Sequence, residues 1–125
     1  MRIRVPFNDL MGKVIIDIQN NYDELVFKCE DGSVYQMLHY QNCCESVYIE
    51  DICGDFEDIK NSPVLVAEEV EGEAAQPHEW SPEYSGESYT WTFYKIDTAK
   101  GGVTIRWCGS SNGYYSESVD FERIA

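Results

Sequence analysis

Residues 13–38, KVIIDIQNNYDELVFKCEDGSVYQML, decide the fold class, because three strand patterns follow one another here with only short turns between them. Alternation over residues 13–19 predicts a half-buried strand. Its two expected faces are Val14, Ile16 and Ile18 on one side and Ile15, Asp17 and Gln19 on the other. Residues 24–29 repeat the pattern, and Asp31-Gly32 is a hairpin signal that leads into residues 34–38. We therefore expect a three-stranded antiparallel meander, with Leu25, Phe27 and Cys29 on one face of its middle strand.

Residues 87–96, ESYTWTFYKI, form the strongest single strand pattern in the chain. Aromatic positions alternate with their neighbours along it: Tyr89, Trp91 and Phe93 against Thr90, Thr92 and Tyr94. A turn at residues 99–102 leads to a second strand pattern, in which Val103, Ile105 and Trp107 alternate with Thr104, Arg106 and Cys108. The sequence therefore predicts that these two strands pair as a hairpin.

Shorter elements fill the rest of the chain. Residues 2–7 predict an edge strand that ends at Pro6, since proline cannot donate to a β-ladder. Further strand patterns cover residues 46–52, 64–71 and 115–121. Asp55 is placed to cap a short helix that runs to about residue 61. Residues 72–86, GEAAQPHEWSPEYSG, have two prolines and no period, which predicts a long loop or hairpin tip.

Together these elements predict a mainly β fold, a β-rich α+β architecture with one short helix. The expected form is a single curved or barrel-like, mostly antiparallel sheet with the helix over one end. A chain of 125 residues fits one domain over residues 1–125, because a chain of this size buries roughly two thirds of its unfolded surface. No cofactor is needed for such a core to fold.

The charge is strongly acidic and unevenly distributed. The formal net charge is −14, and residues 45–83 contain twelve carboxylates against the single base Lys60. Such a surface repels nucleic acid and anionic lipid and attracts proteins with a basic surface. Simple solubility is the alternative explanation. No glycine-rich phosphate loop and no basic cluster is present, so we expect no direct nucleic-acid binding and no membrane binding.

The candidate binding residues follow from this acidity and from two aromatic residues of the long loop. They are Glu50, Asp51, Asp55, Asp58, Glu69, Glu71, Trp80 and Tyr84. Glu69, Glu71 and Glu73 alternate, and we expect Glu50 and Asp58 to continue their row across the sheet. Trp80 is either a contact anchor for a partner or a side chain that folds back over the sheet edge.

A second candidate site is a metal or thiol centre within residues 39–58, HYQNCCESVYIEDICGDFED. Zinc prefers the ligand types found here, with His39, Cys43, Cys44 and Cys53 as possible ligands and Glu45 beside them. The spacing argues against it, because adjacent cysteines point to opposite faces of a strand and no CxxC pair occurs. The alternative is that the cysteines are small core residues.

The first residues, MRIRVPFNDL, lack the apolar core of a signal peptide, so we expect a soluble intracellular protein. Five cysteines in such a compartment should be reduced, and we expect no structural disulfide.

Three segments carry a resemblance to a known family: CCESVYIEDICGD at residues 43–55, SYTWTFYK at residues 88–95, and GGVTIRWCGSSNGYYSES at residues 101–118. The chain resembles a family of small proteins encoded in bacteriophage genomes and prophages and classed as a domain of unknown function. The resemblance covers about residues 12–121 and implies a phage origin and one compact domain. With that origin, we expect a location in the host cytoplasm, with the virion as an alternative. The resemblance assigns no catalytic or binding residues.

Three functions are compatible with these features. The first is a small acidic phage accessory protein that binds a host or phage protein, in its sharpest form a counter-defence inhibitor or nucleic-acid mimic. The second is a small metal- or thiol-dependent enzyme centred on His39, Cys43, Cys44 and Glu45. The third is a minor structural protein of the virion.

Overall fold

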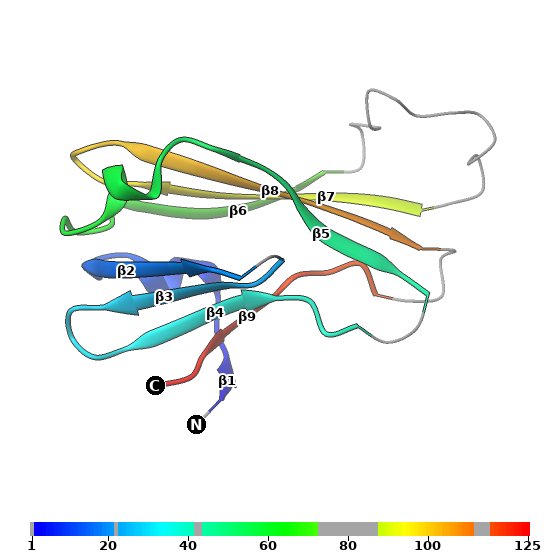
Figure 1. Ribbon diagram of the computed structural model, residues 1–125, viewed down its shortest axis with the longest axis horizontal. Helices are drawn as coiled ribbons and strands as arrows, with labels where there is room; N and C mark the ends of the chain where they lie inside the picture. Colours follow the sequence, from blue (N-terminus) through cyan, green and yellow to red (C-terminus); the bar gives the residue numbers. More distant parts are fainter. Residues whose placement is uncertain (1, 22, 42–43, 73–87, 112–115) are drawn as a thin grey trace.

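The computed structural model describes residues 2–21, 23–41, 44–72, 88–111 and 116–125. Nine strands of this part form two antiparallel sheets that lie face to face (Figure 1). The first sheet has the order β1 (Ile3–Arg4), β9 (Asp120–Arg123), β4 (Val34–Leu38), β3 (Leu25–Cys29) and β2 (Ile15–Asn20). The second sheet has the order β5 (Ser46–Cys53), β8 (Gly102–Ser111), β7 (Ser88–Asp97) and β6 (Val66–Gly72).

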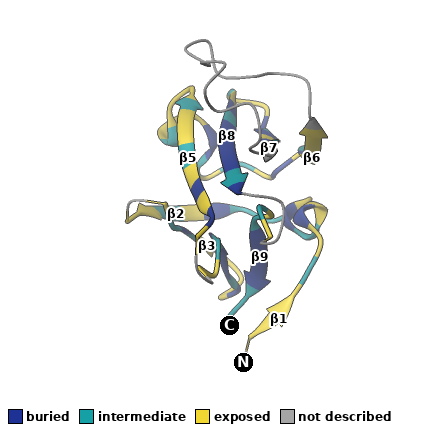
Figure 2. Cartoon of the chain, turned by 90° about the vertical axis from the view of Figure 1, so that its right-hand side faces the viewer, coloured by how far each residue is buried: buried dark blue, intermediate teal, exposed yellow. Residues whose placement is uncertain are grey.

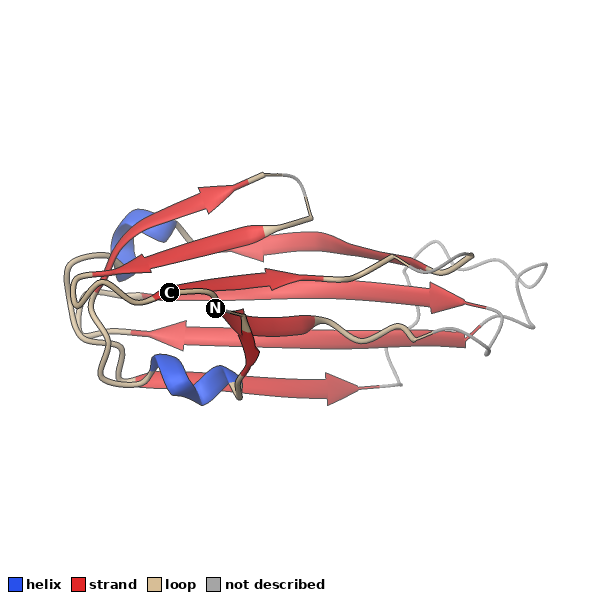
Figure 3. Ribbon diagram, turned by 90° about the horizontal axis from the view of Figure 1, so that it is seen from below, coloured by secondary structure: helices blue, strands red, loops and turns tan. Residues whose placement is uncertain are grey.

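The mainly β class is confirmed, but the expected single curved or barrel-like sheet is wrong. Most strands of both sheets run along the long axis of the molecule, as in an aligned sandwich (Figure 3). Each sheet keeps two edge strands and does not close on itself. A strand with one apolar face can bury that face inside a barrel or between two sheets that cover each other. In this protein the two-sheet arrangement forms.

The expected short helix is a 3-10 turn, η2 (Phe56–Ile59). Asp55 caps it as expected, because its side chain accepts a hydrogen bond from the Glu57 backbone N at 2.9 Å. Gly54 and Asn61, on either side, have φ angles of +107° and +62°. The stretch between these two left-handed residues is too short to stabilise an α-helix. A second 3-10 turn, η1 (Phe7–Leu10), follows β1.

The meander is confirmed, with β2 paired to β3 and β3 to β4. Leu25, Phe27 and Cys29 are all buried, as the alternation predicts. The expected faces of β2 are wrong, because the pairing shifts register between Ile15 and Asp17. This irregularity turns Ile15 into the core and leaves Ile16 48% exposed.

The strand pair β7–β8 is also confirmed, in an unbroken register from Ser88 opposite Ser111 to Asp97 opposite Gly102. Val103, Ile105 and Trp107 are buried between the sheets, as the alternation predicts. The indole N–H of Trp107 donates to the Met37 sulfur at 3.2 Å and so joins the second sheet to the first.

The described residues contain no helix with the length and apolar character that a membrane crossing requires.

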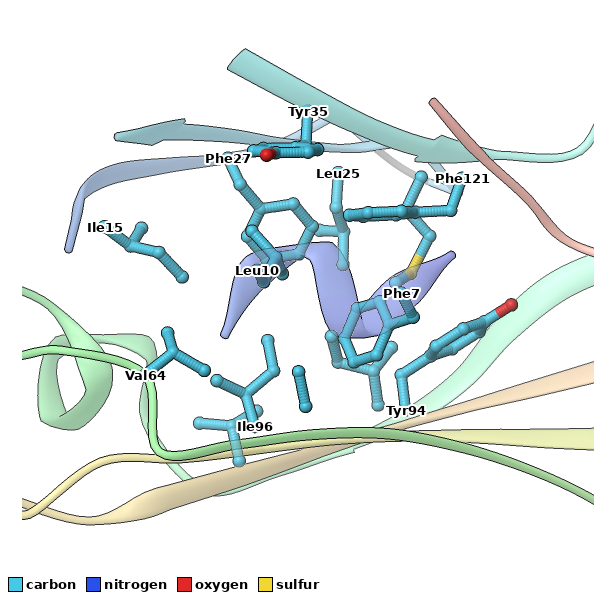
Figure 4. Packing of buried hydrophobic residues seen from close by; sticks show 14 of the residues in the cluster. Phe7, Leu10, Ile15, Leu25, Phe27, Tyr35, Val64, Tyr94, Ile96 and Phe121 are labelled. Atoms are coloured by element: carbon cyan, nitrogen blue, oxygen red, sulfur yellow. The ribbon is translucent and has the colours of Figure 1, made fainter. Parts of the chain in front are cut away.

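Aromatic rings pack against one another within the core between the sheets (Figure 4). Phe7, from η1, packs edge-on against Tyr94 of the second sheet, with 4.8 Å between the ring centroids. It packs in the same way against Phe121 of the first sheet, with 5.1 Å between the centroids. The ring of Tyr35 stacks on that of Phe121, with 5.4 Å between the centroids. The Tyr35 hydroxyl donates a hydrogen bond to Asp9 Oδ2 at 2.7 Å. The turn η1 therefore closes the side of the sandwich that lies next to β6.

Candidate functional site

A buried histidine–glutamate pair lies at one end of the sandwich, between segments that lead from one strand to the next. His39 follows β4, and Glu45 precedes β5. His39 Nε2 lies 3.0 Å from Glu45 Oε2, and these side chains are 5% and 0% exposed. His39 Nδ1 lies 2.7 Å from the backbone O of Ser118, in the segment before β9. The pair therefore fastens the connection between β4 and β5 to the segment before β9, which lies 79 residues further along the chain.

The partners of His39 fix its hydrogen bonding. A carbonyl oxygen only accepts, so Nδ1 carries a proton and donates it to Ser118 O. Nε2 shares one proton with the Glu45 carboxyl group. Gln41 Nε2 donates to the backbone O of Glu45 at 2.6 Å and lies 3.2 Å from its Oε1. In this arrangement both ring nitrogens are engaged, which is a structural use of histidine and leaves no lone pair directed at a metal.

Among the described residues, the structure separates Cys53 from the other possible zinc ligands. Cys53 lies at the far end of β5 from Glu45, a separation of roughly 25 Å along an extended strand. Cys43 lies outside the described residues. No group of three or more His, Cys, Asp or Glu side chains among the described residues could hold a metal ion.

The cysteines differ in their chemical state. Cys29, Cys53 and Cys108 are free thiols. Cys44 is disulfide-bonded, so the expectation that the chain forms no disulfide is wrong at this position. Burial raises the pKa of the Cys29 and Cys108 thiols, which makes both poor nucleophiles at neutral pH.

Cys53 is exposed, yet its surroundings also oppose thiolate formation. Its thiol donates a hydrogen bond to Asp51 Oδ2 at 3.3 Å. This bond and the negative charge of Asp51 raise the pKa of Cys53. A thiol of this kind lacks the positively charged environment that activates catalytic cysteines.

Three of the acidic candidates, Glu50, Asp51 and Asp55, have side-chain partners within the chain, whereas Asp58 is bonded only through its backbone. Arg106 Nε donates to Glu50 Oε2 at 2.5 Å, and the guanidinium lies 3.9 Å from Asp51. Asp55 is the cap of η2. Asp58 is exposed at the same turn, where its backbone O accepts from the Thr98 hydroxyl at 3.3 Å.

Glu69 and Glu71 belong to β6, which is the opposite edge of the second sheet from β5. Two strands, β8 and β7, separate the edges, a distance of roughly 14 Å. The row expected to continue from Glu69 and Glu71 to Glu50 is therefore interrupted, since Arg106 and Lys95 lie on the strands between. Trp80, Tyr84 and Glu73, with most of the expected long loop, lie outside the described residues.

The exposed surface of β6 includes a glutamate that the sequence patterns did not single out. Glu68 lies opposite Lys95 in the register with β7, but Lys95 forms its ion pair with Asp97 at 3.5 Å. Glu69 is held from inside the sandwich, because the Tyr94 hydroxyl donates to its Oε1 at 3.0 Å. The consecutive pair Glu68-Glu69 could have identified this glutamate from the sequence. Neighbouring residues in a strand point to opposite faces, so the two carboxylates cannot both point to the core.

A hollow runs beside β6, between this strand and η1. Its lining is Pro6, Phe7 and Asn8 on one side and Ala67, Glu68, Glu69 and Val70 on the other. A second hollow lies by the opposite edge of the sheet, lined by Asn20, Asp23, Ile49, Asp51 and Ile52. Figure 2 shows β6 at one side of the upper sheet, with exposed residues along it. Both hollows lie beside edge strands.

Comparison with known proteins identifies the family but no function. The family model described as a domain of unknown function, DUF7448, matches residues 8–121. No curated protein and no solved structure matches the chain. Because the family model spans nearly the whole chain, from η1 into β9, the protein belongs to the DUF7448 family, a domain of unknown function.

Proposed function

We propose that this protein is a non-enzymatic binding module whose acidic β6 edge docks on a basic surface of another protein. The observation that carries this proposal is that two glutamates on β6, Glu68 and Glu71, are exposed and have no ion-pair partner among the described residues. Their charges are therefore available to a partner.

The contrast with other acidic groups makes β6 the better candidate. On the opposite edge, Arg106 offsets Glu50 and Asp51. In the first sheet, Arg2 pairs with Glu122 at 2.8 Å, and Lys13 pairs with Asp31 at 2.5 Å. Charge that is already paired inside the chain contributes little to the attraction of a partner, whereas unpaired charge steers association.

The size of this acidic edge favours a short basic segment over mimicry of a nucleic acid. Glu68 to Glu71 spans about 10 Å along the strand. Duplex DNA presents a charge about every 1.7 Å over a much longer surface. If the chain has the phage origin that the sequence resemblance implies, a counter-defence inhibitor with β6 as its contact surface is the role that we propose.

The proposal is tested with a defined probe, a ten-residue peptide of alternating lysine and threonine, and the full-length protein. Affinity is measured by titration calorimetry over a series of salt concentrations. We expect binding at low salt that weakens steadily as salt rises, because screening acts on exposed charge pairs. The absence of binding at low salt, or an affinity independent of salt, would contradict the proposed function.

A further inference from the structure

We infer that the β6 edge takes up an extended lysine- or arginine-rich segment of its partner as an additional strand of the second sheet. This inference rests on the proposed function and adds the conformation of the bound segment. Strand addition uses the main-chain N–H and C=O groups that an edge strand leaves unpaired, and side-chain contacts then select the sequence.

Two edges of the first sheet are unsuited to such pairing. The strand β1 has only two residues. The strand β2 is interrupted by the register shift between Ile15 and Asp17, and the backbone N of Asn61 donates to Ile15 O at 2.8 Å. A short edge and an irregular edge are two ways in which proteins prevent strand addition.

The edge β5 is protected as well. Its register with β8 shifts between Ile49 and Asp51. The side chain of Asp23 accepts a hydrogen bond from the Ile49 backbone N at 3.0 Å, so this N–H is already occupied. A bulge and an occupied donor oppose the docking of another strand along this side.

The edge β6 is long and regular, and η1 lies beside it without pairing with its backbone. All seven of its residues pair with β7 in an unbroken register, from Val66 opposite Asp97 to Gly72 opposite Trp91. Among the described residues, no backbone group outside β7 forms a hydrogen bond with residues 66–72. Within the part of the chain that the structure describes, the outer side of this strand is therefore a regular row of donors and acceptors without backbone partners.

The space and the side chains beside β6 fit an extended segment. The hollow between η1 and β6 follows four consecutive residues of the strand, from Ala67 to Val70. Val70 is 55% exposed, and Leu65, just before the strand, is 56% exposed. These two apolar side chains can cover the alkyl stems of lysine or arginine while the carboxylates meet their charged ends.

Charge complementarity decides which segment is accepted. Glu68, Glu69 and Glu71 repel a second copy of this acidic edge, so β6 does not pair with itself. Glu69 and Glu71 share one face of β6, so they attract a strand that carries positive charge at alternate positions. Charged edges that prevent self-association thus become selective for a basic partner.

The test uses the lysine–threonine peptide and a matched peptide of the same sequence in which alternate backbone nitrogens are methylated. Both peptides have the same charge, but only the first can pair along its whole length. We expect methylation to weaken binding by about tenfold or more. Amide hydrogen exchange of the full-length protein, measured with and without the first peptide, should slow at every second residue of 66–72.

The outcomes separate the two proposals. Equal binding of both peptides, with unchanged exchange along β6, would overturn strand addition and leave binding through charge alone. Absence of salt-dependent binding for either peptide would contradict the proposed function itself. Slowed exchange along β5 instead of β6 would also overturn the inference, because it would place the added strand on the other edge.

Discussion

The hydroxyl of Tyr94 donates a hydrogen bond to Glu69 Oε1 across 3.0 Å, and this bond ties the acidic edge strand to the core. Tyr94 is 1% exposed and packs against Phe7 of η1. Burial and the Glu69 carboxylate together raise the pKa of Tyr94, so the hydroxyl remains a donor throughout the physiological range. The position of β6 therefore depends on a buried side chain of its neighbour β7.

Tyr94→Phe removes only this hydroxyl and leaves the ring in place. We expect the free energy of unfolding to fall by about 1 kcal/mol, since one hydrogen bond to a charged acceptor is lost. Urea denaturation measures the change. Glu69→Gln is the matched control, because the amide oxygen still accepts from Tyr94 and the loss should be smaller. Equal losses in both variants would contradict this role of the hydroxyl.

Glu45→Ala removes the buried partner of His39. We expect a loss of about 1–3 kcal/mol in the free energy of unfolding, because the imidazole and the Gln41 amide each lose a buried acceptor. Glu45→Gln keeps an acceptor at this place and should lose less. Thermal denaturation of both variants provides the measurement, and an unchanged midpoint for Glu45→Ala would show that the pair does not fasten this end of the sandwich.

The Asp31 carboxylate contributes to the loss of folding stability that we expect at low pH. Hydrogen bonds from the Lys13 ammonium and from Ser33 hold the pKa of Asp31 well below its usual value of 3.8. A carboxylate with a lowered pKa in the folded state stabilises the protein above its unfolded pKa, and this stabilisation disappears as the pH falls through the folded pKa. We expect stability to decline below about pH 4. In Asp31→Asn this decline should be shallower, as urea denaturation over a pH series would reveal.

Of the free cysteines in the described part of the chain, we expect Cys53 to react first in the native state, because Cys29 and Cys108 are buried. Asp51→Asn removes the charge that raises the pKa of Cys53, so labelling of this thiol at neutral pH should become severalfold faster. Mass spectrometry of the labelled protein identifies the site. Cys53→Ser serves as the control and should abolish the fast label. An unchanged rate in Asp51→Asn would contradict the influence of Asp51.

The sequence predicted local features of the fold well. Alternation and turn residues identified the meander, the β7–β8 pair, the short edge β1 and the Asp55 cap. Alternation shows which face of a strand is buried, but it does not show which strand lies beside it. The insertion of β9 between β1 and β4, and the pairing of β5 with β8, therefore could not be derived.

The candidate site was predicted in part for the same reason. His39 and Glu45 are six residues apart, and the sequence placed them in one candidate centre, but their burial and the bond to Ser118 depend on β9. Cys53 belonged to the same stretch of sequence, yet an extended β5 carries it to the other end of the sheet. The unpaired state of Glu68 depends on where Lys95 places its ammonium group, which no strand pattern reveals.

The central claim is that the unpaired carboxylates of β6 bind a basic partner, and a matched pair of variants tests it most directly. Glu68→Gln with Glu71→Gln neutralises the two carboxylates of β6 that form no ion pair with a described residue. Glu30→Gln with Asp58→Asn removes the same charge from exposed positions outside β6. Affinity for the lysine–threonine peptide is measured by calorimetry at low salt. The account predicts that the β6 variant binds about three- to tenfold more weakly while the control binds nearly as tightly as the wild type. Equal weakening in both variants would mean that net charge alone attracts the peptide, and it would contradict the assignment of the binding surface to β6.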